Sequence, residues 1–130
     1  MFFALHILLM ATATLGIIAG ISAAIFFRKK NNWLKIHKYF NSCSLLGISV
    51  GVVVAVIYVS SAGGEHIDGL HQIIGLTAFI FTLITLLLWF YQFKVKNKLT
   101  VRTAHRWLGR LSLLLLLAAI ILGLKLINII

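Results

Sequence analysis

Long apolar runs alternate with short polar links along the whole chain. Four such runs cover residues 3–27, 39–62, 70–93 and 107–130, and each reaches the length of about 20 residues that a membrane-spanning helix needs. The links between them are too short to be domains, and short links favour an antiparallel up-and-down arrangement. The pattern therefore predicts an all-α fold, a transmembrane antiparallel four-helix bundle that forms one integral membrane domain over residues 1–130.

Composition agrees with a membrane location. Of the 130 residues, 62% are hydrophobic and none is proline, which is too apolar for an ordinary soluble domain. The first run has no basic segment before it and is too long for the core of a signal peptide, so we expect it to be a retained span. The lipid bilayer is then the first partner of this chain.

The distribution of charge predicts the orientation. The formal net charge is +10, and almost all of the basic residues lie around the first and third links, whereas the two acidic residues, Glu65 and Asp68, lie in the middle link. By the positive-inside rule the first and third links are cytoplasmic, and both termini and the middle link are outside. Because the position of the basic residues beside the membrane spans accounts for the positive net charge, no nucleic-acid partner is expected.

One histidine lies near the start of each apolar run: His6, His37, His71 and His105. Successive helices run in opposite directions, so His6 and His71 should lie near the outer surface and His37 and His105 near the inner surface. In a four-helix bundle each of these pairs joins diagonal helices, whose axes lie roughly 11–14 Å apart, and two imidazoles on one metal fill about that distance. Counted along the helices, the two levels are roughly 30 Å apart before tilt.

The residue types near the two histidine pairs distinguish a zinc site from a haem site. No thiolate or carboxylate near either histidine pair could complete a tetrahedral zinc site. A haem supplies four ligands itself and needs only two axial histidines and an apolar slot. We therefore expect two haem b groups, with metal ligands His6 and His71 for one and His37 and His105 for the other. Covalent c-type attachment is excluded because the chain has no C-x-x-C-H.

Glycines accompany the histidines. Gly75 and Gly109 each follow a histidine by one helical turn on the same face, where a missing side chain would admit a flat macrocycle. Two further pairs, Gly16 with Gly20 and Gly47 with Gly51, have the small-xxx-small spacing. For these the sequence leaves open whether they serve close helix packing or clearance for a haem.

Four segments of the chain, taken in order, resemble the cytochrome b561 superfamily, in particular its four-helix diheme core. They are "LHILLM" at His6, "WLKIHKYFN" at His37 after Arg28, "HQIIGL" at His71 and "HRWLGR" at His105. The resemblance implies transmembrane electron transfer between two haems, with the same axial pairs. It also implies iron-linked redox chemistry of the ferric reductase type, with electrons passing from a donor such as ascorbate on one face to ferric iron, monodehydroascorbate or a partner on the other.

Several basic residues are candidates for the anionic parts of the cofactor. Lys35, Lys38, Arg106 and Arg110 on the inner side could pair with haem propionates or an anionic donor, or could simply set the topology. Lys125 lies near the outer end of the fourth run, where it could meet an outer propionate or extend its amine to the headgroups. Of the remaining residues, His66 is expected in an outer acceptor site or plain loop, and Cys43 in a small buried packing position.

Three functions follow from these residues. The first is a free-standing transmembrane oxidoreductase, and the second is a cytochrome b anchor subunit that exchanges electrons with quinone inside a larger redox complex. The third, from a different class, is a haem-free small transporter that uses the histidines as relays. The sequence leaves open the donor, the acceptor, the direction of electron flow, and whether the chain forms a homodimer or joins a partner subunit.

Overall fold

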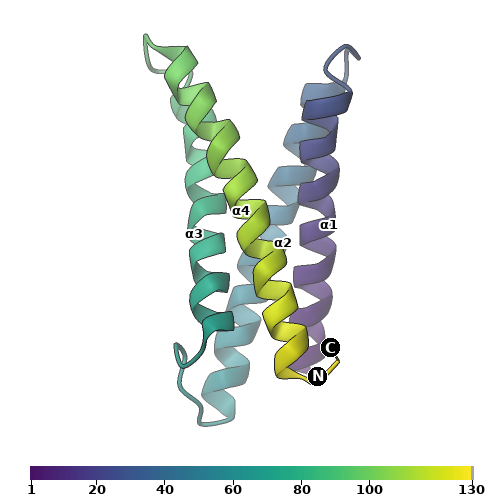
Figure 1. Ribbon diagram of the computed structural model, residues 1–130, viewed down its shortest axis with the longest axis vertical. Helices are drawn as coiled ribbons and strands as arrows, with labels where there is room; N and C mark the ends of the chain where they lie inside the picture. The colour runs from purple at the N-terminus through teal and green to yellow at the C-terminus, as the bar shows by residue number, and fades with distance from the viewer. Residues whose placement is uncertain (130) are drawn as a thin grey trace. The chain divides into compact units, whose positions relative to one another are not determined.

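Four long helices make up the computed structural model, which describes residues 1–129. They are α1 (Phe2–Phe26), α2 (Trp33–Ser61), α3 (Leu70–Tyr91) and α4 (Lys98–Leu126) (Figure 1). All four are long and apolar enough to cross a membrane, and residues 1–129 contain no strand. The predicted all-α transmembrane class is confirmed. The fourth predicted run ended at Ile130, which lies outside the described residues.

Two helices begin earlier than the apolar pattern predicts. α2 starts at Trp33 rather than at Tyr39, and α4 starts at Lys98 rather than at Trp107. The start of α4 is fixed by Asn97, whose side chain accepts a hydrogen bond from the Thr100 backbone N–H at 3.3 Å, since such a cap satisfies one of the free N–H groups of the first turn. Hydropathy marks where a helix enters apolar surroundings, whereas the cap marks where it starts. His37 and His105 consequently lie inside their helices rather than at a loop boundary.

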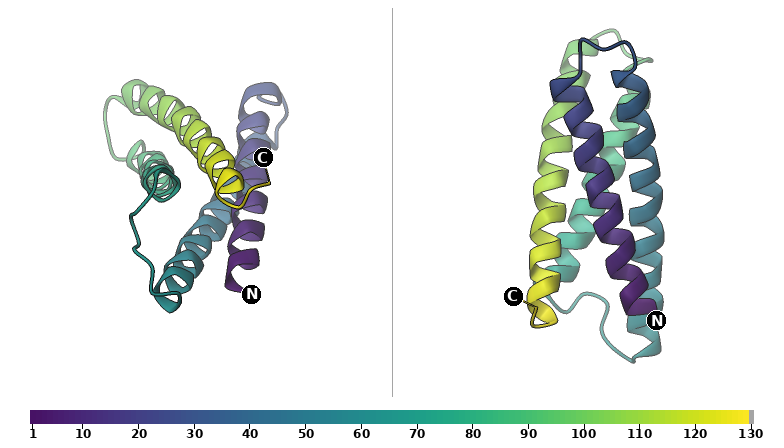
Figure 2. Two further views of the ribbon diagram at one scale, coloured as in Figure 1. Left: turned by 60° about the horizontal axis from the view of Figure 1, so that its bottom comes forward. Right: turned by 90° about the vertical axis from the view of Figure 1, so that its right-hand side faces the viewer.

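The chain divides into two compact units. The first runs from Met1 to His66 and the second begins at Ile67. α1 packs against α2 in the first unit and α3 against α4 in the second. Within each unit the two helices are antiparallel neighbours joined by a short link (Figures 1 and 2). Each unit is thus a helical hairpin.

Small side chains line the seam between α1 and α2. A Cβ on Gly16 would collide with the Ser44 hydroxyl, one on Gly47 would lie 3.2 Å from the Ala13 Cβ, and one on Gly51 would lie 3.0 Å from the Met10 sulfur. Close approach of this kind is what small residues provide in membrane helices, where no hydrophobic force drives helices together. Of the two roles left open for these glycines, packing is the one the contacts favour.

Cys43 does not have the buried position that its residue type suggested. It is exposed, although its neighbours Ser44 and Leu45 are buried. One residue along a helix turns the side chain by about 100°, which takes Cys43 off the face that packs on α1. The expectation of a buried packing role was wrong.

The seam of the second hairpin follows a similar pattern. Its fully enclosed residues are mostly small, and Leu116 is the one large side chain among them. Many large apolar side chains elsewhere on all four helices remain exposed. A surface of this composition is suited to lipid or to another apolar partner rather than to water.

Replacing Gly16 by valine should destabilise the first hairpin. The added side chain meets Ser44 at the closest part of the seam, and overpacking of this kind costs about 1–3 kcal/mol. Thermal unfolding in detergent, followed by circular dichroism, measures the effect. The matched control is Ala11→Val, which places the same side chain on an exposed position of α1. Equal melting temperatures for the two variants would contradict the packing role of Gly16.

Candidate histidine site

Each of the four helix histidines makes the same bond across its hairpin. The Nδ1 atoms of His6 and His37 lie 2.9 and 2.8 Å from the carbonyl oxygens of Gly51 and Gly20. In the second hairpin, the Nδ1 atoms of His71 and His105 lie 2.8 and 2.9 Å from the carbonyl oxygens of Ala119 and Thr85. A carbonyl oxygen can only accept, so every Nδ1 carries the hydrogen. In the neutral ring, the lone pair is then on Nε2 in all four cases.

This tautomer is the one suited to a metal ligand. Histidines that bind metals through one ring nitrogen usually donate the other N–H to a carbonyl or carboxylate, which fixes the ring and raises its basicity. Within residues 1–129, no group of three or more His, Cys, Asp or Glu side chains gathers as a protein-built metal cage would require. Each helix contributes one imidazole of this tautomer.

Each hairpin holds its two histidines at opposite ends. On α1, His6 and the acceptor Gly20 are about four helical turns apart, or about 21 Å. The same separation holds between His37 and Gly51 on α2, and on both helices of the second hairpin. The separation along each helix is therefore shorter than the expected value of roughly 30 Å.

The two hairpins follow one plan. Residues of α1 and α3 correspond at one constant spacing along the sequence, which relates His6 to His71 and Gly20 to Thr85. Residues of α2 and α4 correspond at another constant spacing, which relates His37 to His105 and Gly51 to Ala119. Buried residues repeat with the same offsets: Ala13 matches Ala78, Ser44 matches Ser112 and Ile48 matches Leu116. The chain therefore carries the same imidazole arrangement twice.

A hollow adjoins His71 within the second hairpin. It lies between the start of α3 and the end of α4, and its lining includes His71, Gln72, Lys125 and Asn128. Lys125 is exposed, and its ammonium is the one charged group of that lining. The structure thus brings Lys125 to the same end of the hairpin as His71, where an anionic group next to the imidazole would meet it.

Three glycines differ in what surrounds them. A Cβ added to Gly75 would meet nothing within 4 Å, and one on Gly109 would meet the Thr85 methyl at 3.6 Å. A Cβ on Gly123, by contrast, would lie 3.0 Å from Cε1 and 3.2 Å from Nδ1 of His71. Gly75 therefore leaves open space one turn after its histidine, and Gly123 makes room for the imidazole itself.

The remaining basic candidates are all exposed: Lys35, Lys38, Arg106 and Arg110. Lys38 directly follows His37 and Arg106 directly follows His105. The Arg110 guanidinium stacks over the Trp107 ring, 5.3 Å from its centroid. These side chains lie near the histidines in sequence, and their contacts with an anionic group stay a prediction.

His66 lies apart from this arrangement. It is exposed in the link after α2, and its Nε2 lies 3.2 Å from the Ser60 hydroxyl. Its partner is thus a side chain of the same unit rather than a carbonyl of a neighbouring helix. The difference supports the expectation that His71, not His66, belongs with the other three histidines.

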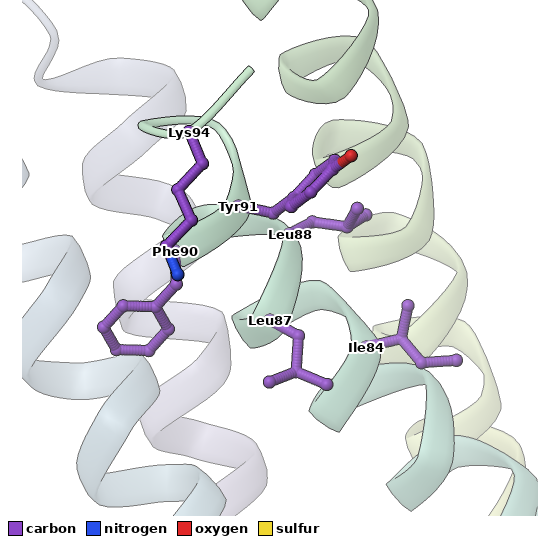
Figure 3. A pocket seen from close by; sticks show the side chains of 6 residues that line it. All are labelled: Ile84, Leu87, Leu88, Phe90, Tyr91 and Lys94. Carbon is purple, nitrogen blue, oxygen red and sulfur yellow. The ribbon is translucent and has the colours of Figure 1, made fainter.

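A second hollow lies on α3, away from the histidines. It is lined by Ile84, Leu87, Leu88, Phe90, Tyr91 and Lys94 (Figure 3). All of these side chains come from α3 and the turn after it, and the Lys94 amine is its one charged group. An apolar surface that ends in a lysine and a tyrosine is typical of a helix at the edge of a bilayer.

Sequence reasoning missed several participants. The four carbonyl acceptors leave no mark in a sequence, because every residue has a carbonyl. Asn41 carries a signal that could have been used, because it lies one turn beyond His37. Gly123 carries none, because its role depends on its contact with His71 of the neighbouring helix. The predicted axial pairs join residues of different hairpins and stay a prediction.

A family model described as eukaryotic cytochrome b561 matches residues 1–129. No curated protein and no solved structure matches the chain.

Replacing Gly123 by alanine should displace the His71 ring. The added methyl would press on the edge of the imidazole that carries Nδ1, so the bond to the Ala119 carbonyl should lengthen. Long-range ¹H–¹⁵N NMR of the histidine rings measures this as a shift of the His71 nitrogens. His6 and His105 in the same sample are internal controls and should not move; an unmoved His71 would contradict the supporting role of Gly123.

Proposed function

Since this chain belongs to the eukaryotic cytochrome b561 family, whose role is transmembrane electron transfer with b-type haem, we propose that it carries electrons through two haems. His6 and His71 hold one of them, and His37 and His105 hold the other. The observation that carries the proposal is the set of four imidazole-to-carbonyl bonds, each of which leaves the lone pair on Nε2. Four imidazoles of one tautomer, two in each hairpin, match in number two groups that need two ligands each.

The histidines position and tune the cofactor. When bound, a b-type haem supplies one-electron chemistry at its iron. The carbonyl of the neighbouring helix holds each ring in place and increases its electron density, which favours the ferric state. Two histidines would hold each haem and leave no ligand position for oxygen or substrate, which would favour electron transfer over oxygen activation.

The two levels of histidines set the path across the membrane. They are about 21 Å apart along the helices, and the breadth of the porphyrin rings shortens the gap between their edges. Gly75 and Gly109 admit the flat macrocycle one turn after their histidines, which the open space at Gly75 supports.

Lys125 is the candidate partner for an outer propionate. It lines the same hollow as His71, and a cation near the end of a span is stabilised by an anion. On the other side, Lys35, Lys38, Arg106 and Arg110 serve the inner propionates or receive an anionic donor. We place that side in the cytoplasm, with both termini and the link between α2 and α3 outside, because the basic links follow the positive-inside rule.

Single histidine replacements test the haem ligands. His37→Ala should remove one haem and leave the other, and His71→Ala should remove the other haem, because each haem loses one axial ligand. Pyridine haemochromogen content per chain and reduced-minus-oxidised spectra measure this. The control is His66→Ala, which should keep both haems. A colourless wild-type protein, expressed with ample haem, would favour the haem-free transporter instead.

Vesicles test the direction and the acceptor. Purified protein in liposomes that contain trapped ascorbate should reduce an external ferric chelate, and the rate should fall to that of empty liposomes in the His37→Ala variant. Absorbance of the ferrous product gives the rate. Reduction of added quinone in place of the chelate, together with a soluble subunit that co-purifies, would indicate the anchor-subunit function instead.

A further inference from the structure

A side-chain amide lies beside one of the four imidazoles. The Asn41 Nδ2 atom is 3.2 Å from the His37 Nδ1 and 2.6 Å from the His37 backbone oxygen. We propose that Asn41 is a positioning residue that raises the reduction potential of the haem bound by His37. The inference rests on the proposed function, since it assumes that His37 is an axial ligand.

The orientation of the amide follows from its two contacts. Only an NH₂ group can donate to the His37 carbonyl, so Nδ2, not the amide oxygen, faces the histidine. The His37 Nδ1 already donates to the Gly20 carbonyl at 2.8 Å. Two N–H groups therefore meet at one edge of the ring, and the positive end of the amide dipole lies against the imidazole.

That contact opposes the effect of the carbonyl. The Gly20 carbonyl increases the electron density of the ring, which favours ferric iron, whereas a positive dipole at the same edge withdraws density and favours ferrous iron. Both groups lie in half-buried surroundings, where electrostatic interactions are stronger than in water. Asn41 therefore weakens His37 as a donor to iron and raises the potential.

The neighbouring glycine is part of the same arrangement. A Cβ on Gly20 would collide with the Asn41 amide, so Gly20 both accepts from His37 and leaves the space that Asn41 fills. The position that matches Asn41 in the second hairpin is Gly109, and the position that matches Gly20 is Thr85. The Thr85 methyl lies 3.6 Å from where a Gly109 Cβ would be, so a methyl group stands there in place of an amide.

The two axial ligands of one haem are then unequal. His37 has an amide from its own helix at the Nδ1 edge, and His105 has a glycine at the matching helix position. Because this inequality concerns the His37 and His105 haem alone, it separates the potentials of two haems whose ligand types are otherwise the same. The level with Asn41 is the more readily reduced.

The test replaces Asn41 by leucine in the holoprotein. The apolar side chain has a similar size, removes the dipole and leaves the Gly20 bond, so the midpoint potential of one haem should fall. At a fixed ambient potential we expect the ferrous-to-ferric ratio of that haem to drop by up to about tenfold, which is about 59 mV for a one-electron couple. Redox titration followed by absorbance, and the low-spin ferric EPR signals, report each haem separately.

Two further variants complete the design. Ser49→Ala removes a side-chain bond to the carbonyl four residues earlier on α2, the Leu45 carbonyl; Asn41 makes the same type of bond, so this control should leave both potentials unchanged. Asn41→Ser is the second test variant, because its short hydroxyl does not bring a dipole to Nδ1 and fits any site that accepts asparagine. If the leucine variant does not accumulate, the midpoint potentials of the serine variant decide whether Asn41 raises the potential of the haem.

The outcomes separate the two proposals. A fall confined to the haem that His37→Ala removes supports the role of Asn41. Unchanged potentials with both haems bound, or an equal shift of both haems, would overturn it and leave the proposed function intact. If His37→Ala keeps both haems, the ligand assignment itself fails, whatever the Asn41 variants show.

Discussion

The hydrogen bond from an imidazole Nδ1 to a backbone carbonyl of the neighbouring helix is the interaction on which the site depends. Inside a helix each carbonyl already accepts one N–H, and its second lone pair is what the histidine uses. A side chain on one helix is thereby fixed by the main chain of another, and the bond forms only where the two backbones are close. The small residues of the seam, Gly20 and Gly51 among them, are what permit that approach. Helix packing and the orientation of the imidazoles thus both depend on how close the two backbones lie.

The sequence was sufficient for the helices and for the choice of histidines, because both depend on residue type and spacing. Four apolar runs of spanning length gave the fold class, and the recurrence of one histidine per run identified the residues that make the equivalent bonds. Helix starts were less accessible, since hydropathy does not report a cap such as Asn97. The burial of Cys43 was misjudged because which face of α2 meets α1 depends on packing. The acceptor carbonyls and the contact of Gly123 with His71 could not be predicted, since they depend on how the two helices of a hairpin are aligned.

The repeated plan explains why differences between the hairpins are informative. Where the two copies agree, as at Ala13 and Ala78 or Ser44 and Ser112, the residues serve the seam that both require. Where the two copies differ, the residue can have a role that is specific to the histidine beside it in one hairpin. Asn41 and Gly109 differ in this way, and so do Gly20 and Thr85, and in both cases the change lies next to a histidine. The two hairpins thus share one geometry but differ in the groups beside their histidines.

The hairpin division also bears on how the protein is made. Every seam contact of the first hairpin, and both of its imidazole bonds, join residues that precede Ile67. Contacts that are local in sequence form quickly and need no long loop to close. The first hairpin can therefore pack before the second is complete, with its two histidines already oriented. In the proposed function, haem binding then follows the folding of each hairpin and is not a condition for it.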